Sequence, residues 1–343
     1  MRTEIIPVEQ AVGQILAHDI TKIVRGEFKG TAFKKGYIIQ EQDIEELLKL
    51  GKENIFALLL EEGDIHEDEA GIRLGQLAAG AGVRCSPPKE SRVNLFATQP
   101  GLLKINLPAM EEINDLPDVV LSTLPHNSVV KEGEMLAGTK VIPLVVREQV
   151  LKDAEGIACE PLLRVVPFGK KKFGVIVTGN EVFKGRVKDG FGPVLTEKIG
   201  HYGSTLLKLD YAPDDAVIIA EKVQQLVTSE AEVILVSGGM SVDPDDVTPL
   251  GIRQSGAEII KYGAAALPGA MFLMAYLGEV PVMGIPACGM YFKNTILDLL
   301  LPRILIGEKI TRRDIVKLAH GGLCRSCPQC HYPNCTFGLG VSL

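Results

Sequence analysis

The sequence predicts an α/β protein in which a doubly wound, mostly parallel sheet forms the largest domain and smaller α+β modules precede it. Two observations support this prediction. Between residues 161 and 308, short apolar runs alternate with helical stretches, the pattern of a sheet covered by helices. Within that region Val233–Val236 is apolar without interruption, as in a parallel strand buried on both faces. The chain has 343 residues, enough for two or three domains.

The composition argues against several classes of function. The formal net charge is −7 and Trp is absent, whereas nucleic-acid-binding proteins present a basic face and often aromatic stacking platforms. No apolar segment follows Met1 as it would in a signal peptide. The apolar stretch 264–290 contains three prolines, which break it too often for a membrane-spanning helix. We therefore expect a cytoplasmic protein with no nucleic-acid or membrane partner.

The first expected module covers residues 1–82. Its expected elements are a short helix leading into a strand over 8–20, a turn and strand over 35–39, and a helix over 42–50 that Gly51 ends. The acidic run 61–69 contains His66. A solvated loop with a helix start is favoured there over a metal site.

The second expected module covers residues 83–160. Strand-like pieces at 103–106, 119–122 and 141–146 are separated by turn residues. Ser86–Pro88 and Ala154–Ala158 are the expected boundaries of this module. Nothing in it indicates chemistry, and we expect a small α+β unit.

The sheet domain is predicted over residues 161–308, and residues 309–343 form a cysteine-rich tail. The expected strands are 173–178, 205–209, 233–236, 258–261, 272–277 and 280–285. The expected helices are 193–202, 214–228, a short segment that Thr248 caps ahead of Pro249, and 289–301.

Three loops of this domain follow strands and are rich in glycine, small residues and hydroxyls: 178–181, 237–239 and 284–290. In open α/β sheets, ligands bind beyond the carboxyl ends of the strands, and such loops let backbone N–H groups face an anion. The carboxylates expected around this site are Glu181, Asp189, Asp243, Asp245 and Asp246. They would repel a phosphate unless Mg²⁺ lies between them. The alternative is that these carboxylates are solvated in loops or cap helices and bind no ligand.

Four segments together resemble the molybdopterin-binding domain of the molybdopterin molybdenumtransferases and of the smaller adenylyltransferases related to them. They are Thr178-Gly-Asn-Glu-Val, Ser237-Gly-Gly-Met-Ser-Val-Asp-Pro-Asp-Asp-Val-Thr, Pro268-Gly269 and Gly284-Ile-Pro-Ala. Ala11-Val-Gly-Gln-Ile-Leu-Ala-His-Asp-Ile is similar to the N-terminal segment of the transferases, so the resemblance covers most of residues 1–308. It implies a cytoplasmic homodimer that binds the pterin dithiolene phosphate. The transferases insert molybdate into adenylylated molybdopterin with Mg²⁺ and release AMP.

The resemblance also implies roles for individual residues. Asp246 and Asp189 match functional aspartates of the family and are the expected catalytic residues, although Gly190-Phe-Gly after Asp189 does not match. The expected ligand-binding residues lie in the loops and are Thr178, Gly179, Asn180, Glu181, Ser237, Gly238, Gly239, Ser241, Asp245, Thr248, Pro268, Gly269, Pro286, Ala287, Cys288 and Gly289.

Three positions depart from the family pattern. Asn180 stands where the transferases have aspartate, and Pro286-Ala-Cys-Gly replaces Pro-Gly-Asn-Pro. The turn Leu267-Pro-Gly-Ala-Met271 lacks both lysines of the pattern Lys-Pro-Gly-Lys-Pro. Each missing charge-assisted contact to an anion is worth about 1.5–3 kcal/mol. Binding of molybdopterin is therefore better supported than insertion of molybdate.

The tail carries the pattern C-x₂-C-x₂-C-x₄-C, formed by Cys324, Cys327, Cys330 and Cys335. Without a secretion signal, such clustering favours metal ligation over disulfides. Four thiolates can hold Zn²⁺ or an iron–sulfur cluster, and the tight triplet favours the cluster. The standard transferases lack this tail. His331 is either a spare ligand or a solvent-facing residue. For Cys288, a packed small residue is favoured over an activated thiol.

Two functions of different class follow. The first is a molybdenumtransferase-like protein that binds molybdopterin or its adenylylated form, with Asp189, Asp245 and Asp246 holding Mg²⁺ for molybdate insertion. The second is a non-catalytic molybdopterin-binding carrier, or a sensor whose cysteine tail reports redox or metal state. A nucleotide pyrophosphatase is a weaker alternative, because Asp-Pro-Asp-Asp-Val-Thr also resembles the related domain of the competence-damage-inducible proteins.

Overall fold

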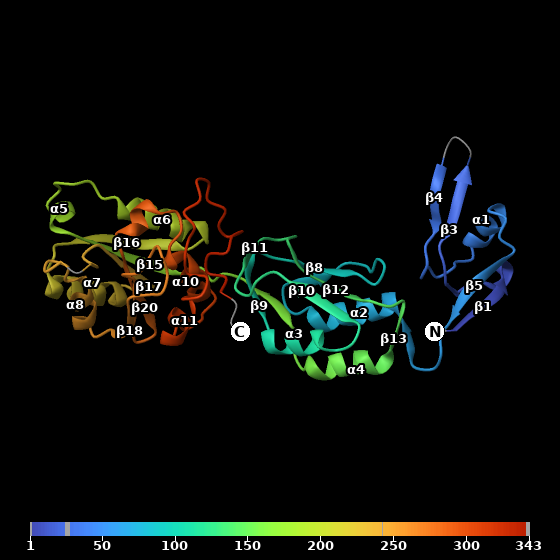
Figure 1. The fold of residues 1–343 in the computed structure, drawn as a ribbon. Coiled ribbons are helices and arrows are strands. Elements are labelled where there is room, and N and C mark those ends of the chain that lie inside the picture. Colours follow the sequence, from blue (N-terminus) through green and yellow to red (C-terminus); the bar gives the residue numbers. More distant parts are fainter. Residues whose placement is uncertain (1, 25–27, 242, 341–343) are drawn as a thin grey trace. The chain divides into compact units, whose positions relative to one another are not determined.

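The structure is a computed structural model that describes residues 2–24, 28–241 and 243–340. Val242 of the predicted loop and residues 341–343 of the predicted tail lie outside this range. The chain divides into two compact units (Figure 1). One contains residues 1–99, 103–124 and 130–165, and the other contains 100–102, 125–129 and 166–343.

The first unit begins with a small antiparallel sheet and one helix. The predicted helix over 42–50 is confirmed as α1 (Asp43–Lys49). The helix expected after Val8 is only a 3-10 turn, because Gly13, at φ +79°, redirects the chain. The strand expected at 37–39 is wrong, since Ile38 makes only an isolated bridge to Ile15. The elements here are β1 (Arg2–Pro7), η1 (Val8–Gln10), β2 (Ile15–Leu16), β3 (Ile20–Val24), β4 (Phe28–Phe33) and β5 (Asn54–Leu59).

The acidic run forms β6 (Asp64–His66) and the start of α2 (Glu67–Ala78). His66 Nδ1 accepts from the Asp68 N–H at 3.3 Å, so its Nε2–H donates to Gly36 O at 2.9 Å. The solvated loop is confirmed at residues 61–63, an exposed turn, and the helix start is confirmed at Glu67. His66 and Glu67, in contrast, are only 6% and 7% exposed. His66 therefore caps a helix.

A second core lies farther along in the same unit. Ala70 and Leu74 of α2 pack with Leu95 and Val141 of an antiparallel sheet with the order β10-β12-β8-β7. The strand expected over 141–146 is two strands separated by Pro143, which cannot donate to a ladder. The elements are β7 (Val83–Cys85), β8 (Val93–Ala97), β9 (Gly101–Ile105), α3 (Leu107–Asn114), β10 (Val119–Thr123), β11 (Val129–Val130), β12 (Met135–Val141), β13 (Val145–Arg147), α4 (Glu148–Ile157) and β14 (Leu163–Val166).

The second unit contains the predicted doubly wound sheet. Its six strands have the order β16-β15-β17-β20-β19-β18, and the first four are mutually parallel. β19 runs antiparallel to β20, and β18 antiparallel to β19. Every predicted strand of this domain is present: β15 (Lys172–Thr178), β16 (Thr205–Ala212), β17 (Val233–Ser237), β18 (Glu258–Tyr262), β19 (Leu273–Leu277) and β20 (Val280–Ile285).

Helices cover both faces of this sheet (Figure 1). Val175 and Leu235 point into a core with α6 (Phe191–His201) and α10 (Ile296–Leu305), whereas Ile176 and Ile234 point into a core with α7 (Ala216–Thr228) and α8 (Thr248–Gln254). Successive strand residues face opposite sides, so a continuous apolar run supplies both cores. This explains why Val233–Val236 contains no polar residue.

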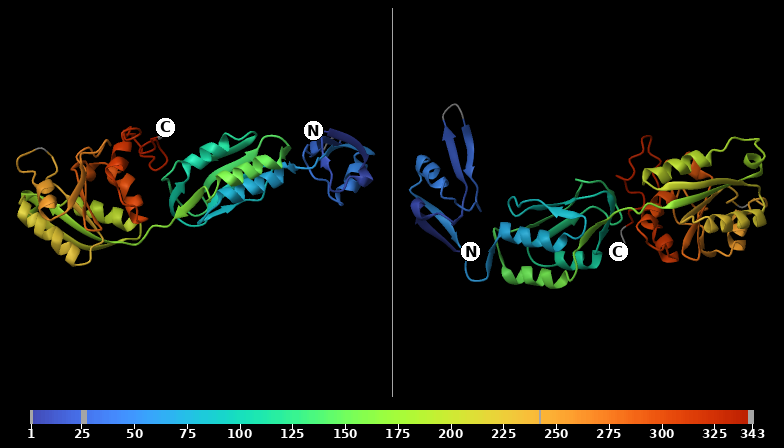
Figure 2. Two further views of the ribbon diagram at one scale, coloured as in Figure 1. Left: turned by 90° about the horizontal axis from the view of Figure 1, so that it is seen from below. Right: turned by 180° about the vertical axis from the view of Figure 1, so that it is seen from behind.

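The helix predicted over 289–301 is wrong as a single element. α9 (Cys288–Tyr291) ends before Phe292, and α10 begins at Ile296 behind a capping box formed by Thr295 and Asp298. The described residues end with α11 (Arg312–Lys317) and an irregular segment, drawn red beside the helices of this domain in Figures 1 and 2. No described helix is long and apolar enough to cross a membrane.

Candidate functional site

The strand register places the predicted loops at one edge of the sheet. Val177 of β15 lies beside Ser237 of β17, and Ser237 lies beside Ile285 of β20. Because these strands are parallel, the loops that follow them leave the same carboxyl edge. Leu273, the first residue of β19, pairs with Gly284, so the Pro268–Gly269 turn before it also approaches this edge.

A buried set of hydroxyl groups supports the loop after β17. Thr178 Oγ1 donates to Ser237 O at 3.2 Å and lies 3.0 Å from Thr248 Oγ1. Thr178 is 3% exposed, and Ser237 and Thr248 are fully buried. The capping role predicted for Thr248 is wrong, because Thr248 is the first residue of α8 and its hydroxyl faces Thr178. These hydroxyls are structural supports beneath the loops.

Gly238 and Gly239 permit this close approach. Gly238 has φ +93°, and a Cβ there would lie 2.3 Å from Thr178 O. Gly239 has φ +53°, and its Cβ would lie 2.7 Å from Thr248 Oγ1. Both positions need a residue without a side chain. The loop can therefore pack directly on Thr178 and Thr248, and contact between its backbone and a ligand stays a prediction.

Asp246 organises its own loop. Its Oδ2 accepts from the N–H groups of Ser241 at 3.0 Å and Asp243 at 3.2 Å. The Tyr262 hydroxyl, from the end of β18, donates to Met240 O at 2.9 Å and braces the same loop. Burial, with a contribution from the Asp246 charge, raises the pKa of Tyr262. β18 runs in the same direction as β20, because each is antiparallel to β19, so the carboxyl end of β18 lies at this edge. Sequence reasoning missed Tyr262 although it directly follows the strand predicted over 258–261.

A further carboxylate, Asp214, joins the acidic residues of this edge. Its Oδ2 accepts from the Asn180 N–H at 2.9 Å, which fixes the start of α5 (Asn180–Phe183). Burial raises the pKa of Asp214, the Asn180 N–H opposes that shift, and the charges of Glu181, Asp245 and Asp246 add to it. Asp214 follows the end of β16 (Thr205–Ala212) by two residues, so its position after a parallel strand was a signal that sequence reasoning overlooked.

Asp189 has a different environment. Its Oδ1 accepts from the N–H groups of Phe191 at 2.7 Å and Gly192 at 3.0 Å, at the start of α6. Its Oδ2 accepts from the Tyr211 hydroxyl at 3.1 Å. Asp189 also lines a shallow hollow with Tyr211 and Lys222. The structure shows it as a helix cap, and its catalytic role stays a prediction.

The loop after β20 and the Pro268–Gly269 turn complete the edge. Gly289 N donates to Pro286 O at 2.9 Å, which closes the turn around Ala287 and Cys288. Burial raises the pKa of Cys288, which agrees with a packed residue and not with an activated thiol. A Cβ on Gly269, at φ +124°, would lie 2.6 Å from the Ile296 side chain, so the turn packs directly on the start of α10.

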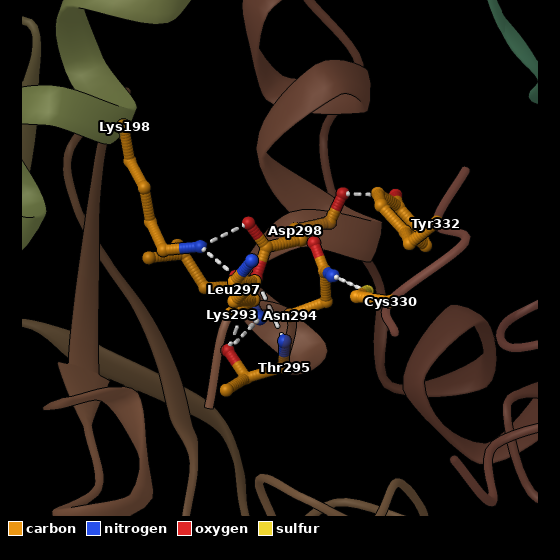
Figure 3. A network of polar contacts seen from close by, with 8 residues as sticks. All are labelled: Lys198, Lys293, Asn294, Thr295, Leu297, Asp298, Cys330 and Tyr332. Atoms are coloured by element: carbon orange, nitrogen blue, oxygen red, sulfur yellow. Dashed lines mark hydrogen bonds and ion pairs between the residues drawn. The ribbon is translucent and has the colours of Figure 1, made fainter. Parts of the chain in front are cut away.

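The four tail cysteines line one cavity of about 460 Å³, together with Asn294, His331 and Tyr332. Asn294 Nδ2 donates to Cys330 Sγ at 2.8 Å, and the Tyr332 hydroxyl donates to Asp298 O at 2.9 Å (Figure 3). All seven cysteines are free thiols. Within residues 2–24, 28–241 and 243–340, no three His, Cys, Asp or Glu side chains are close enough to hold a single metal ion.

A comparison with protein families identifies the sheet domain. Residues 174–305 match the family described as "Probable molybdopterin binding domain". This domain belongs to that family. The match supports molybdopterin as the ligand of the domain and a role in molybdenum cofactor biosynthesis. Residues 5–58 match a family described as a domain of unknown function.

Individual relatives resemble only part of the chain. A protein of Archaeoglobus fulgidus is 34% identical over 84 residues, 24% of this chain and 36% of that protein. A CinA-like protein of a Mycobacterium species (strain JLS) is 33% identical over 88 residues, 25% of this chain and 21% of that protein. The aligned segments thus span about a third or less of the length of these relatives.

Solved structures were also compared with the chain. The Mog protein of Mycobacterium ulcerans is 18% identical with a TM-score of 0.33, covering 40% of this chain and 97% of that one. MoaB of Thermus thermophilus is 16% identical with a TM-score of 0.34, covering 40% of this chain and 98% of that one.

Proposed function

We propose that the carboxyl edge of the molybdopterin-binding domain binds molybdopterin or adenylylated molybdopterin. The observation that carries this proposal is the meeting of glycine loops at one edge of a sheet whose family is known. The backbone N–H groups of Gly238 and Gly239 are the proposed donors to phosphate oxygens. The N–H of Gly179, the third glycine predicted to line the site, donates to Ala212 O at 3.2 Å instead. Of the other loop residues named from the sequence, the buried Thr178, Ser237 and Thr248 support the loops from beneath, and the remainder are proposed to form the walls of the site.

We further propose that Mg²⁺ binds with the ligand. Glu181, Asp214, Asp245 and Asp246 would repel a phosphate, and their mutual repulsion contributes to the raised pKa of Asp214. A divalent cation between these carboxylates and the phosphate would relieve both effects. Mg²⁺ commonly uses one or two carboxylates together with substrate oxygens, so it does not require a preformed protein cage.

With Mg²⁺ and molybdate, the domain would act as a molybdenumtransferase-like enzyme. In that reaction the bound molybdopterin would receive molybdate and AMP would leave. Asp246 and Asp189 are the proposed catalytic residues. Asp246 has the better support, because it lies in the loop after β17, whereas Asp189 caps α6.

One observation favours a carrier without catalysis. Residues 263–271 contain no lysine or arginine, although this turn approaches the site. A wall without cations binds molybdate weakly. The third alternative, nucleotide pyrophosphatase activity, has support only from the sequence of the Asp243–Thr248 segment.

An anaerobic assay tests these alternatives together. The full chain is incubated with adenylylated molybdopterin, Mg²⁺ and molybdate, and AMP and molybdenum-loaded cofactor are measured. Both products are expected from a transferase. If ligand is bound but no AMP forms, only the non-catalytic carrier remains. If AMP forms without molybdenum insertion, the result supports nucleotide hydrolysis. No bound ligand would overturn the proposal.

Asp246→Asn provides a matched variant for this assay. An amide oxygen can still accept from Ser241 and Asp243, so the loop should keep its shape. We expect ligand to be retained and its dependence on Mg²⁺ to be lost. Asp246→Ala removes the acceptor as well and should weaken binding with or without Mg²⁺.

The proposed setting is a cytoplasmic homodimer whose four tail cysteines bind Zn²⁺ or an iron–sulfur cluster. The free thiols support a reducing compartment. All four cysteines line one cavity, and since the described residues contain no preformed group of three ligands, a metal centre would require these side chains to move together. Sedimentation measurements and metal analysis of the purified chain test these points.

A further inference from the structure

The C-terminal segment is bonded to the molybdopterin-binding domain. Leu267 N donates to Gly322 O at 2.8 Å, and Cys324 N donates to Leu267 O at 2.8 Å. This two-bond bridge attaches the segment to the residue before Pro268. Gly338 N donates to Gly321 O at 2.9 Å, which folds the segment back on itself.

A second attachment lies at the start of α10. Asn294 donates to Cys330, and the Tyr332 hydroxyl donates to the backbone carbonyl of Asp298 (Figure 3). Phe337 of the same segment is 3% exposed and contacts the ring of Tyr332. The cysteine segment is therefore anchored both at the Pro268–Gly269 turn and at the helix on which that turn packs.

The sequence spacing of the four cysteines favours a cluster over a single ion in the cavity between these anchors. Tetrahedral Zn²⁺ with Zn–S bonds of ~2.3 Å needs sulfur atoms about 4 Å apart, and the described residues contain no such group of three ligands. All four cysteines nevertheless face one cavity of about 460 Å³. An iron–sulfur cluster holds its cysteines farther apart, and the C-x₂-C-x₂-C triplet is typical of such clusters.

N–H donors already point at two of the sulfur atoms. Asn294 Nδ2 lies 2.8 Å from Cys330 Sγ, and Ser326 N lies 3.5 Å from Cys324 Sγ. Such donors stabilise thiolates and tune the potentials of iron–sulfur clusters. Asn294 lies outside the tail, between α9 and α10, so the domain itself contributes a group to the cysteine site.

We propose that Cys324, Cys327, Cys330 and Cys335 bind an iron–sulfur cluster that holds the Pro268–Gly269 turn in place, with Asn294 as its positioning residue. The cluster would fix Cys324, whose N–H bonds to Leu267, and Cys330, which bonds to Asn294. Gly269 packs on Ile296, two residues after Asn294. Only the relevance of this turn to ligand binding rests on the proposed function.

Metal content tests the first part of this proposal. The full chain is purified anaerobically, and iron, acid-labile sulfide and zinc are quantified with the visible absorption spectrum. We expect iron and sulfide in the wild type, loss of both in Cys327→Ser, and retention in Cys159→Ser, a matched change of another exposed cysteine. Zinc without sulfide, or no metal, would overturn the cluster.

Hydrogen exchange tests the link to the turn. Exchange of residues 263–272 is compared in the loaded wild type, the same protein after chelation, and Cys159→Ser. Removing the cluster should speed exchange in 263–272 at least several-fold and leave 233–237 unchanged. Equal exchange before and after chelation would overturn the link. The chelated wild type makes this test independent of whether a cysteine variant folds.

Asn294→Leu tests the positioning role, because it keeps a similar side-chain shape and removes the N–H donor to Cys330 without adding a charge. We expect retained iron with a shifted reduction potential, and an unchanged potential would overturn this role. None of these measurements contains molybdopterin. If the chain contains a cluster whose removal speeds exchange in 263–272 but does not bind pterin, the proposed pterin binding is refuted and this inference stands. If the chain binds pterin but contains no cluster, this inference is refuted and the proposed pterin binding stands.

Discussion

The two walls of the candidate site are held in different ways. The loop after β17 is fixed from within the sheet, by the buried hydroxyls of Thr178 and Thr248 that meet at 3.0 Å. The Pro268–Gly269 turn is fixed from outside, by backbone bonds between Leu267 and the C-terminal segment. The first wall therefore depends on the domain alone, whereas the second depends on a segment that follows the domain in the chain.

The largest effect is expected at the first wall. Gly238→Ala should abolish ligand binding and lower the free energy of unfolding by about 2–4 kcal/mol, because it combines a strained φ with a backbone clash at 2.3 Å. Urea denaturation and pterin binding measure these effects. Gly278→Ala is the control, since Gly278 has φ +61° but open space around its Cβ. Equal losses in both variants would contradict the close-approach argument.

Gly322→Ala should affect the second wall. A Cβ at Gly322 would lie 2.3 Å from Ala265 O and 2.3 Å from Leu318 O, so the segment must move away from Leu267. We expect a loss of about 1–3 kcal/mol and faster hydrogen exchange in 263–272. Gly200→Ala, with nothing near its Cβ, is the comparison. Unchanged exchange in 263–272 would mean that the bridge does not hold the turn.

A smaller effect is expected when the buried hydroxyl pair is broken. Thr248→Val leaves Thr178 without this partner and should destabilise the domain by about 1–2 kcal/mol, while Thr248→Ser keeps the bond. Thermal or urea unfolding distinguishes the two variants. If the Thr248→Val and Thr248→Ser variants were equally stable, the loop after β17 would not depend on this contact.

The smallest effect concerns pH. The pKa of Asp214 is raised in the folded chain above its ordinary value of 3.8. At a pH just above 3.8, the folded chain therefore still holds a proton on Asp214 that the unfolded chain has released. Stability from this group is present below that pH and is lost as the pH rises through the raised pKa. Asp214→Asn should flatten this part of the stability curve. The same substitution should also reduce the stabilisation that Mg²⁺ gives at pH 7. If the free energy of unfolding depended on pH in the same way for the wild type and Asp214→Asn, the account would be contradicted.

The sequence predicted the first wall better than the second. Continuous apolar strands and the Ser237-Gly-Gly motif are local signals, so the sheet of 161–308 and its loops could be placed correctly. The helix over 289–301 was wrong because the Thr295–Asp298 capping box, with its Thr-x-x-Asp pattern, was overlooked. Asp214 and Tyr262 were missed although both lie at the ends of predicted strands: the strand before Asp214 was expected to stop at 209, whereas β16 continues to Ala212, and β18 continues to Tyr262.

The cysteine segment shows the same limit. Its spacing indicated a metal site, but no sequence signal placed Cys324 beside Leu267 or Asn294 beside Cys330. Those contacts join residues far apart in the chain. Through them the four-cysteine segment, which the sequence presents as a separate tail, supports the Pro268–Gly269 turn.

The most direct test of the central claim is equilibrium binding of molybdopterin to the anaerobically purified full chain, followed by the fluorescence of the oxidised pterin. The account predicts saturable binding at one site per chain that Gly238→Ala abolishes and Gly278→Ala preserves. Binding that is absent from the wild type, or unchanged by Gly238→Ala, would contradict it.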